Sequence, residues 1–224
     1  MLTAYGKKFA YDGFIAVLKE ANDSYHHIPL MQSIKKEDQY PYRVLIGTIL
    51  SARTQDKLTA MISEKLFLKA PNPLKLSQLS EKEIIDLIYP VGFYRRKAKN
   101  IRTIAFLLLE KYHGRIPDKI EDLLLFPGVG RKTANLVLGT AFKIDTISVD
   151  THVHRISNRL GILRTKIPEE TEQDLRSIFP QEYWIILNPY LVSHGQFICK
   201  PISPICSQCK INQFCQRIGI GRSR

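Results

Sequence analysis

The chain has 224 residues, of which 44% are hydrophobic and 24% are charged, a composition typical of a globular protein and unlike that of a disordered or membrane-embedded one. This length allows one large domain or two smaller domains that share an interface. Lysine and arginine number 33 against 21 aspartate and glutamate, so the formal net charge is +12. This excess is expected of a protein that binds a polyanion, although charge alone is equally consistent with a basic surface that binds nothing.

The amino-terminal segment MLTAYGKKFAYDGF lacks the apolar core of a secretory signal. The longest apolar stretches, such as VLIGTIL at residues 44–50, are too short to span a bilayer. All four cysteines fall within residues 199–215, whereas disulfides that stabilise a fold would be spread along the chain. These features predict an intracellular protein, in the cytoplasm or nucleoid, with no membrane partner.

Most of the periodic signals along the chain are helical. In chain order, the first helices are predicted in RVLIGTILSA and KLTAMISEKLF, residues 43–52 and 57–67. Ser80 and Glu83 then have the spacing of a capping box before the apolar run IIDLI. The clearest helix is predicted by apolar residues spaced three and four apart from Ala98 to Tyr112, with Gly114 as its stop.

The second half of the chain continues the helical pattern. Asp118 and Glu121 repeat the capping-box spacing, and further helices are predicted over residues 134–138 and 153–160. Sustained alternation of apolar and polar residues is scarce, and no repeat or long linker interrupts the chain. We therefore expect an all-α fold of about ten helices with short connections.

The segment FPGVGRKT, residues 126–133, has two conventional interpretations. A nucleotide-binding P-loop requires a preceding strand and a glycine directly before its lysine, but Arg131 occupies that position and the upstream KIEDLLLF has a helical pattern. A plain turn between helices fits better, because Pro127 ends one helix while Gly128 and Gly130 give the backbone freedom before the next.

A third interpretation of this segment is a DNA contact. The backbone amides of the turn and the unpaired N–H groups that open the next helix would face a phosphate, a role that we assign to Gly128, Val129, Gly130 and Arg131. Lys132 then falls in the first helical turn, where the macrodipole disfavours a cation by about 0.3–1 kcal/mol. A phosphate contact or a role as nucleophile would each explain a lysine in that place.

Asp150, in SVDTH, directly precedes the helical stripe of Val153, Ile156 and Leu160. Its position favours a plain role as the N-cap of that helix. Capping is compatible with catalysis, because a carboxylate held in one orientation can stabilise a developing positive charge.

The four cysteines have the arrangement C-x6-C-x2-C-x5-C. Thiolates this close would repel one another unless a metal centre neutralised them, which favours coordination over free thiols. A tetrahedral zinc ion and a [4Fe–4S] cluster both accept four cysteines, so the chemistry alone does not choose between them. The predicted ligands are Cys199, Cys206, Cys209 and Cys215.

Taken together, these motifs resemble those of the endonuclease III family of helix-hairpin-helix DNA glycosylases. FPGVGRKTAN is followed, eighteen residues after Lys132, by Asp150 in SVDTHVHR, and the resemblance extends from YPYRVLIGTILSA to the last cysteine. The cysteine spacing is that of family members that hold a [4Fe–4S] cluster, so the resemblance favours iron–sulfur over zinc.

The resemblance implies two helical lobes with a DNA cleft between them. Residues 29–143 would form a six-helix barrel that contains the helix-hairpin-helix motif at about residues 120–139. Residues 1–28 and 144–224 would form the iron–sulfur lobe. Lys132 and Asp150 would then lie on opposite lobes.

Further roles follow from the resemblance residue by residue. A base inside a duplex must be extruded before an active-site lysine can reach its sugar, and the family's two wedge positions correspond to Arg53 and Phe93. Apart from the resemblance, the basic run after Phe93 predicts phosphate contacts or a solvated face for Arg95, Arg96, Lys97 and Lys99. His152 corresponds to a position near DNA, and the loop KPISPI retains only Lys200 as a phosphate contact.

The predicted function is base excision repair by a bifunctional DNA glycosylase and abasic-site lyase that removes oxidised pyrimidines. Lys132 would form a Schiff base and β-elimination would cut the strand, with Asp150 as its partner. The expected partner is double-stranded DNA with damaged bases or abasic sites, bound by a monomer. The alternatives are a monofunctional mismatch glycosylase of the same fold and a non-enzymatic DNA-binding protein with a four-cysteine metal site.

Overall fold

The structure is a computed structural model that describes residues 10–23 and 40–224. Every regular element in those two ranges is helical, which confirms the predicted all-α fold. Among the same residues, no helix combines the length and hydrophobicity needed to cross a membrane. The chain divides into two compact units: Leu30–Ile144, which we call the hairpin unit, and Met1–Pro29 with Asp145–Arg224, which we call the cysteine unit.

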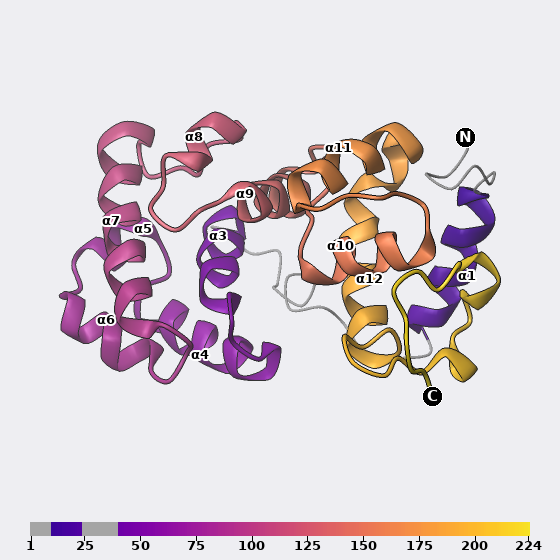
Figure 1. Ribbon diagram of the computed structural model, residues 1–224. Coiled ribbons are helices and arrows are strands. Elements are labelled where there is room, and N and C mark those ends of the chain that lie inside the picture. The colour runs from indigo at the N-terminus through magenta and orange to yellow at the C-terminus, as the bar shows by residue number, and fades with distance from the viewer. Residues whose placement is uncertain (1–9, 24–39) are drawn as a thin grey trace. The chain divides into compact units, whose positions relative to one another are not determined.

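The hairpin unit, drawn in violet to pink in Figure 1, is built from consecutive helices that pack on one another. Helix α7 packs against α5 and α6, and α3 packs against α4, α7 and α9. The elements are α3 (Tyr40–Ser51), α4 (Asp56–Lys69), α5 (Pro73–Ser77), α6 (Glu81–Ile88), α7 (Tyr94–Tyr112), α8 (Ile120–Leu124), α9 (Arg131–Val137) and the π-helical turn η1 (Leu138–Phe142).

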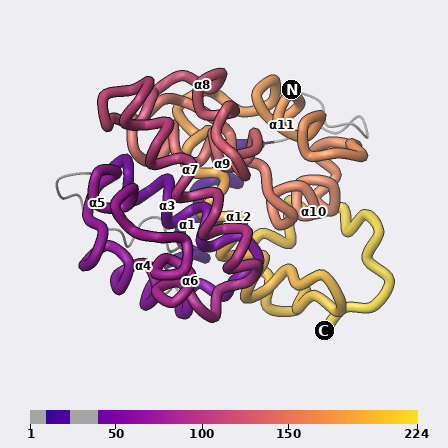
Figure 2. The backbone as a smooth tube through the Cα atoms, turned by 90° about the vertical axis from the view of Figure 1, so that its left-hand side faces the viewer, coloured from indigo at the N-terminus to yellow at the C-terminus, as the bar shows by residue number. Residues whose placement is uncertain are grey.

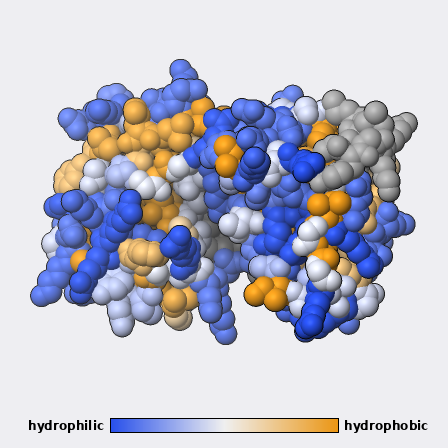
Figure 3. Space-filling view, viewed as in Figure 1, coloured by the Kyte–Doolittle hydropathy of each residue, from blue (hydrophilic) through white to orange (hydrophobic). Residues whose placement is uncertain are grey.

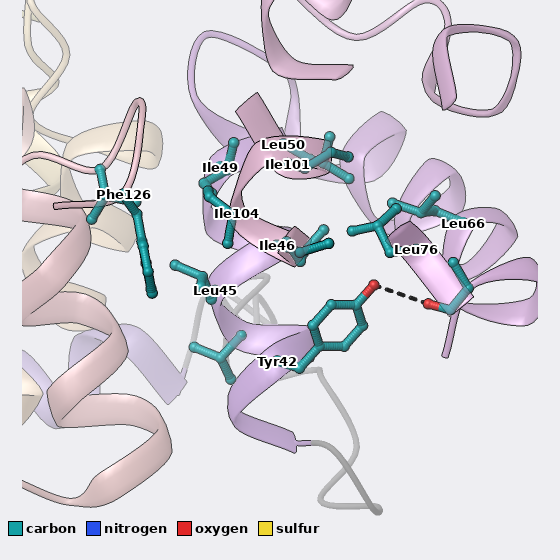
Figure 4. Packing of buried hydrophobic residues seen from close by; sticks show 14 of the residues in the cluster. Tyr42, Leu45, Ile46, Ile49, Leu50, Leu66, Leu76, Ile101, Ile104 and Phe126 are labelled. Atoms are coloured by element: carbon teal, nitrogen blue, oxygen red, sulfur yellow. Dashed lines mark hydrogen bonds between the residues drawn. The ribbon is translucent and has the colours of Figure 1, made fainter. Parts of the chain in front are cut away.

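The core of the hairpin unit surrounds α3, whose central residues are almost completely buried. Figure 4 shows aliphatic side chains from several helices packed around this helix. The Tyr42 ring lies among them, and its hydroxyl donates a hydrogen bond of 3.0 Å to the Ala70 carbonyl oxygen, so the one polar atom of the ring has a partner. Burial raises the pKa of Tyr42.

Helix ends in the hairpin unit agree with two of the predicted boundary signals and differ from a third. The Ser80–Glu83 capping box is confirmed, with Ser80 N–H donating to the Glu83 carboxylate at 2.8 Å and Glu83 N–H donating to Ser80 Oγ at 3.2 Å. The helix ending before Gly114 is confirmed as α7, and Gly114 has a φ of 76° that favours glycine. The Asp118 capping box is wrong: α8 begins at Ile120, and its N-cap is Lys119, with no side-chain cap bond.

The cysteine unit packs α10 (Thr151–Leu160) against α11 (Pro168–Ile178) and α12 (Trp184–Phe197), with α1 (Tyr11–Asp23) beside α12. Its core is formed by apolar residues of these helices and of the segment before α10. After α12 the chain runs through turns to its end, as the yellow part of the tube in Figure 2 shows. The 3-10 turns of this unit are η2 (Gln181–Tyr183), η3 (Cys206–Gln208) and η4 (Asn212–Phe214).

Candidate active site and cysteine cavity

The hairpin consists of α8, the turn of residues 125–130, and α9. Val129 is 7% exposed and anchors the turn in the core, while its N–H donates to the Phe126 carbonyl oxygen at 3.1 Å. Gly128 has a φ of 81°, and a Cβ there would meet the side-chain amide of Asn100. Gly130 is exposed, and a Cβ there would have no neighbour within 4 Å. The turn therefore needs glycine at position 128, whereas position 130 is open on its outer side.

Lys132 is exposed at the second position of α9, which begins at Arg131 after Gly130 as its N-cap. The prediction that Lys132 lies in the first turn of this helix is confirmed. No acidic residue occupies that turn, and its N-cap, Gly130, has no side chain to cap it. Two cationic side chains, Arg131 and Lys132, therefore stand at the positive end of one helix, an arrangement suited to an anionic ligand.

Apolar side chains also reach the surface beside the hairpin. In Figure 3 hydrophobic residues gather over α7 and α8 on the face in view. Phe106 is 43% exposed, Leu124 42% and Leu125 66%.

The two predicted wedge residues lie together although 40 residues separate them. Arg53, between α3 and α4, and Phe93, the N-cap of α7, both have left-handed backbone, with φ values of 53° and 57°. The Arg53 guanidinium carbon lies 5.5 Å from the centre of the Phe93 ring, within the range of a cation–π contact. The ring is 61% exposed, so it is not the core aromatic that an ordinary Phe would be.

Lys97 is not the phosphate contact or solvated residue that the basic run RRKAK predicts. It is 6% exposed, and its ammonium donates hydrogen bonds to the carbonyl oxygens of Leu50 at 2.8 Å and Ala52 at 2.7 Å. A third bond, of 3.2 Å, goes to Thr54 Oγ1. Burial lowers the pKa of Lys97 to about 8. Arg95, Arg96 and Lys99 are exposed, in agreement with the prediction.

In the cysteine unit, Asp150 is the N-cap of α10. One of its carboxylate oxygens accepts from the N–H groups of His152 at 2.8 Å and Val153 at 2.9 Å. Val153, Ile156 and Leu160 form the buried stripe of the helix. The predicted capping role is therefore confirmed, and the carboxylate is held in one orientation at a helix N-terminus.

The two histidines after Asp150 have partners within their own unit. His152 is half-buried, and its Nδ1 lies 3.1 Å from the guanidinium of Arg155. His154 Nδ1 lies 2.7 Å from Thr171 Oγ1. Among residues 10–23 and 40–224, no three His, Cys, Asp or Glu side chains meet closely enough to hold a single metal ion.

The four cysteines line one cavity, together with apolar residues and His194. None of them forms a disulfide. Burial raises the pKa of Cys209 to about 12 and raises that of Cys215 as well. Several groups approach the sulfurs: Arg159 Nη1 donates to Cys199 Sγ at 3.4 Å, and the Arg217 N–H donates to Cys215 Sγ at 3.3 Å. His194 Nε2 lies 3.6 Å from Cys209 Sγ.

Helix α10 also holds the loop that follows Cys199. The Arg155 guanidinium donates to the Cys199 carbonyl oxygen at 2.8 Å. The Arg159 guanidinium donates to the carbonyl oxygens of Lys200 at 2.7 Å and Pro201 at 2.6 Å. The same helix therefore carries Asp150 at its start and fixes the first cysteine near its end.

The sequence predicts the wrong role for Lys97 and does not indicate Thr54, Arg155 or Arg159. A signal for Lys97 was present, because it lies four residues before Ile101 on the apolar stripe of α7. Arg155 and Arg159 are likewise four residues apart and therefore on one helix face. Neither spacing indicates that these side chains bond to distant carbonyl oxygens. The hydrogen bonds of Lys97, Arg155 and Arg159 are therefore visible only in the structure.

Comparison with known proteins gives one family. Residues 46–181 match the HhH-GPD superfamily base excision DNA repair protein family. Endonuclease III of Thermotoga maritima is 48% identical over 176 residues, which cover 79% of this chain and 83% of that protein. Endonuclease III of Synechocystis is 38% identical over 178 residues, covering 79% and 81% of the two chains.

Solved structures agree with this result. A trapped covalent intermediate of Endonuclease III with DNA superposes with a TM-score of 0.81 at 33% identity, over 94% of this chain and 97% of that one. A non-covalent Endonuclease III–DNA complex gives the same TM-score at 34% identity, with the same coverage.

Proposed function

The chain belongs to the endonuclease III family within the HhH-GPD superfamily, and on that premise we propose how its own residues excise bases from damaged double-stranded DNA. It is a base excision repair enzyme with DNA glycosylase and abasic-site lyase activity. We propose oxidised pyrimidines as the bases removed, and damaged or abasic duplex DNA as the partner of a monomer.

The proposed nucleophile is Lys132. Its neutral amine attacks C1′ of the damaged nucleotide, the glycosidic C–N bond breaks, and the base leaves with its electron pair and takes up a proton. The sugar ring opens to a Schiff base on Lys132. Loss of a C2′ proton then expels the 3′ phosphate by β-elimination, and water releases the lysine. No external redox cofactor is consumed.

Asp150 is the proposed partner of Lys132. Its carboxylate assists deprotonation of the lysine or stabilises the positive charge that develops on the sugar in the transition state. Its two bonds from the start of α10 support this role, because they fix the orientation of the carboxylate. Capping and catalysis are then two uses of the same side chain.

The proposed DNA contacts lie at the hairpin and at the two wedge residues. The hairpin contacts a phosphate through Gly128, Val129, Gly130 and Arg131, and Arg53 and Phe93 fill the space left by the extruded nucleotide. His152 and Lys200 are further candidate contacts. The open side of Gly130 supports the hairpin contact, and the exposed, stacked pair of Arg53 and Phe93 supports the wedge.

The observation that carries the lyase proposal is the exposed Lys132 at the second position of α9, directly after the glycine turn. Monofunctional mismatch glycosylases of the same fold lack a lysine there and activate water instead. A non-enzymatic DNA-binding protein would need neither Lys132 nor its acidic partner.

We also propose that the four cysteines hold a [4Fe–4S] cluster, one thiolate to each iron. The donor set fits: four thiols line one cavity, and N–H groups from Arg159 and Arg217 point at two of the sulfurs. A bound cluster of this kind supplies structural cross-linking or electron transfer rather than an open site for substrate. Metal analysis tests the proposal, because zinc in place of iron would overturn it.

The proposed domains are a six-helix barrel over residues 29–143 and a cluster domain of residues 1–28 with 144–224. The two compact units of the fold support this division. We propose the cytoplasm or nucleoid as the site of action.

Borohydride trapping on abasic-site DNA tests the lyase directly. The iron-loaded protein should form a covalent adduct that is lost in Lys132→Ala and retained in Lys111→Ala, which removes an exposed lysine at the far end of α7. The proposal fails if active, iron-loaded protein gives no adduct, or if the adduct persists in Lys132→Ala.

A further inference from the structure

The wedge residues Arg53 and Phe93 belong to two separate segments, one after α3 and the other before α7. Each has a left-handed backbone that disfavours a side chain, so neither segment would keep this conformation without support. Hydrogen bonds from groups outside the two segments hold them in place.

The buried side chain of Lys97 holds the segment that carries Arg53. Its ammonium has three N–H donors, and the structure gives it three acceptors, the carbonyl oxygens of Leu50 and Ala52 and the hydroxyl of Thr54. These acceptors lie at the end of α3 and on both sides of Arg53. A single buried cation therefore bonds the chain immediately before and immediately after the first wedge residue.

The segment that carries Phe93 is joined to the same group of atoms. Thr54 Oγ1, which accepts from Lys97, also accepts from the Gly92 N–H at 3.0 Å. Any side chain at Gly92 would run into the Arg53 carbonyl oxygen, so the two segments are in direct backbone contact. The Lys97 N–H donates to the Phe93 carbonyl oxygen at 3.0 Å, which ties the lysine's own helix to the second wedge residue.

We propose that Lys97 is a positioning residue that, through Thr54 and Gly92, fixes Arg53 and Phe93 as one preformed wedge for nucleotide extrusion. This inference rests on the proposed function, in which these two residues enter the duplex. Lys97 does not touch DNA in this role. Its burial and three bonds account for a cation inside the hairpin unit, where an unpaired charge would be strongly unfavourable.

The chemistry of extrusion separates this role from a general structural one. A lesion in a duplex must be unstacked and its gap filled, whereas an abasic site in single-stranded DNA needs neither step. Losing the lysine should therefore slow excision from duplex DNA far more than adduct formation with single-stranded abasic DNA.

The test compares iron-loaded wild type with Lys97→Met, which keeps the length of the apolar stem and removes the donors. We expect excision of an oxidised pyrimidine from duplex DNA to fall about tenfold or more, because bonds from a buried charged donor are lost. Borohydride trapping on single-stranded abasic DNA should change by less than about twofold. Lys111→Met, on the same helix, is the matched control and should change neither rate.

A fluorescent base analogue, 2-aminopurine, placed opposite the lesion gives an independent signal. Its fluorescence intensity rises when the lesion nucleotide is extruded from the duplex. Lys97→Met should lower that signal at saturating protein. In a Phe93→Ala background the same substitution should add little, because both act on one wedge. Additive losses, or equal losses on duplex and single-stranded substrates in a folded variant, would overturn the proposal.

Thr54 provides a second route if Lys97→Met does not fold. Thr54→Val removes the shared acceptor and should reproduce the selective loss on duplex DNA, while Thr54→Ser, which keeps the hydroxyl, should restore it. Equal activities of Thr54→Val and Thr54→Ser would reject the positioning role. Absence of any adduct with the wild type would instead reject the lyase proposal, so the two failures are distinguishable.

Discussion

At the scale of single residues, Asp150 has an observed role in folding and a proposed role in chemistry. Its carboxylate caps α10 through two backbone N–H groups, and the same carboxylate is the proposed partner of Lys132. Asparagine caps helices about as well as aspartate but carries no charge. The two uses of the residue can therefore be separated by substitution.

We predict that Asp150→Asn leaves the free energy of unfolding almost unchanged and lowers the excision rate about 100-fold or more, because the charge that we propose faces the sugar is lost. Asp150→Ala should lose the activity and about 0.5–2 kcal/mol of stability as well. Urea unfolding and single-turnover excision measure the two effects. If Asp150→Asn kept full activity, Asp150 would have only the structural role of a helix N-cap.

Lys97 is a residue whose stability effect should depend on pH. Burial lowers its pKa to about 8, whereas the unfolded chain holds the proton up to the ordinary value of 10.5. Between these values the folded protein binds fewer protons than the unfolded chain, so its stability rises with pH in that window, and below about pH 8 the burial penalty is fully present.

We therefore predict that wild type gains stability relative to Lys97→Met between about pH 7.5 and about pH 9.5. Groups common to both proteins cancel in this difference, which urea unfolding at the two pH values measures. An exposed control, Lys111→Met, should show no such change relative to wild type. A flat or opposite difference for Lys97→Met would contradict the lowered pKa.

At the scale of elements, the hairpin turn uses its two glycines differently. Gly128 has left-handed backbone and faces Asn100, while Gly130 has a φ of −101° and open space outside it. The first glycine is required by the fold, and the second leaves room for a ligand.

We predict that Gly128→Ala lowers the free energy of unfolding by about 1–2 kcal/mol, because alanine is strained at positive φ. Gly130→Ala should fold as well as the wild type but bind duplex DNA more weakly, because its methyl group would separate the turn from a phosphate. Thermal unfolding and fluorescence anisotropy with labelled DNA distinguish the two outcomes. If Gly130→Ala bound DNA as tightly as the wild type, the proposed phosphate contact at position 130 would be rejected.

How far the sequence predicts these elements depends on whether the information is local. The α7 stripe, the Ser80 cap and the Asp150 cap are all visible within a few residues, and all three are confirmed. The Asp118 cap failed because α8 is only one short turn that begins two residues later. The burial of Lys97 differs from the prediction for another reason, because its partners lie more than 40 residues away in the sequence, where no spacing rule applies.

At the scale of the whole molecule, the net charge of +12 is larger than a single DNA contact requires. Counterions are released from DNA only where a protein cation neutralises a phosphate. The slope of log affinity against log salt therefore reports how many phosphates are neutralised. We predict that Arg131→Ala reduces the slope of log affinity against log salt by about one, whereas Arg217→Ala, beside Cys215, leaves it unchanged. Anisotropy titrations over a range of salt concentrations measure the slope, and equal slopes for wild type and Arg131→Ala would exclude this phosphate contact.

The proposed DNA-binding hairpin and the proposed catalytic carboxylate belong to different units, and this affects how the activity of a purified sample should be measured. The hairpin that is proposed to grip DNA belongs to one unit, while α10 ties Asp150 to the cysteine loop in the other. A preparation without the proposed cluster should therefore still shift DNA in a gel while Asp150, the proposed partner of Lys132, is misplaced. The active fraction of a batch is then given by the yield of trapped adduct, and a binding titration would overstate it.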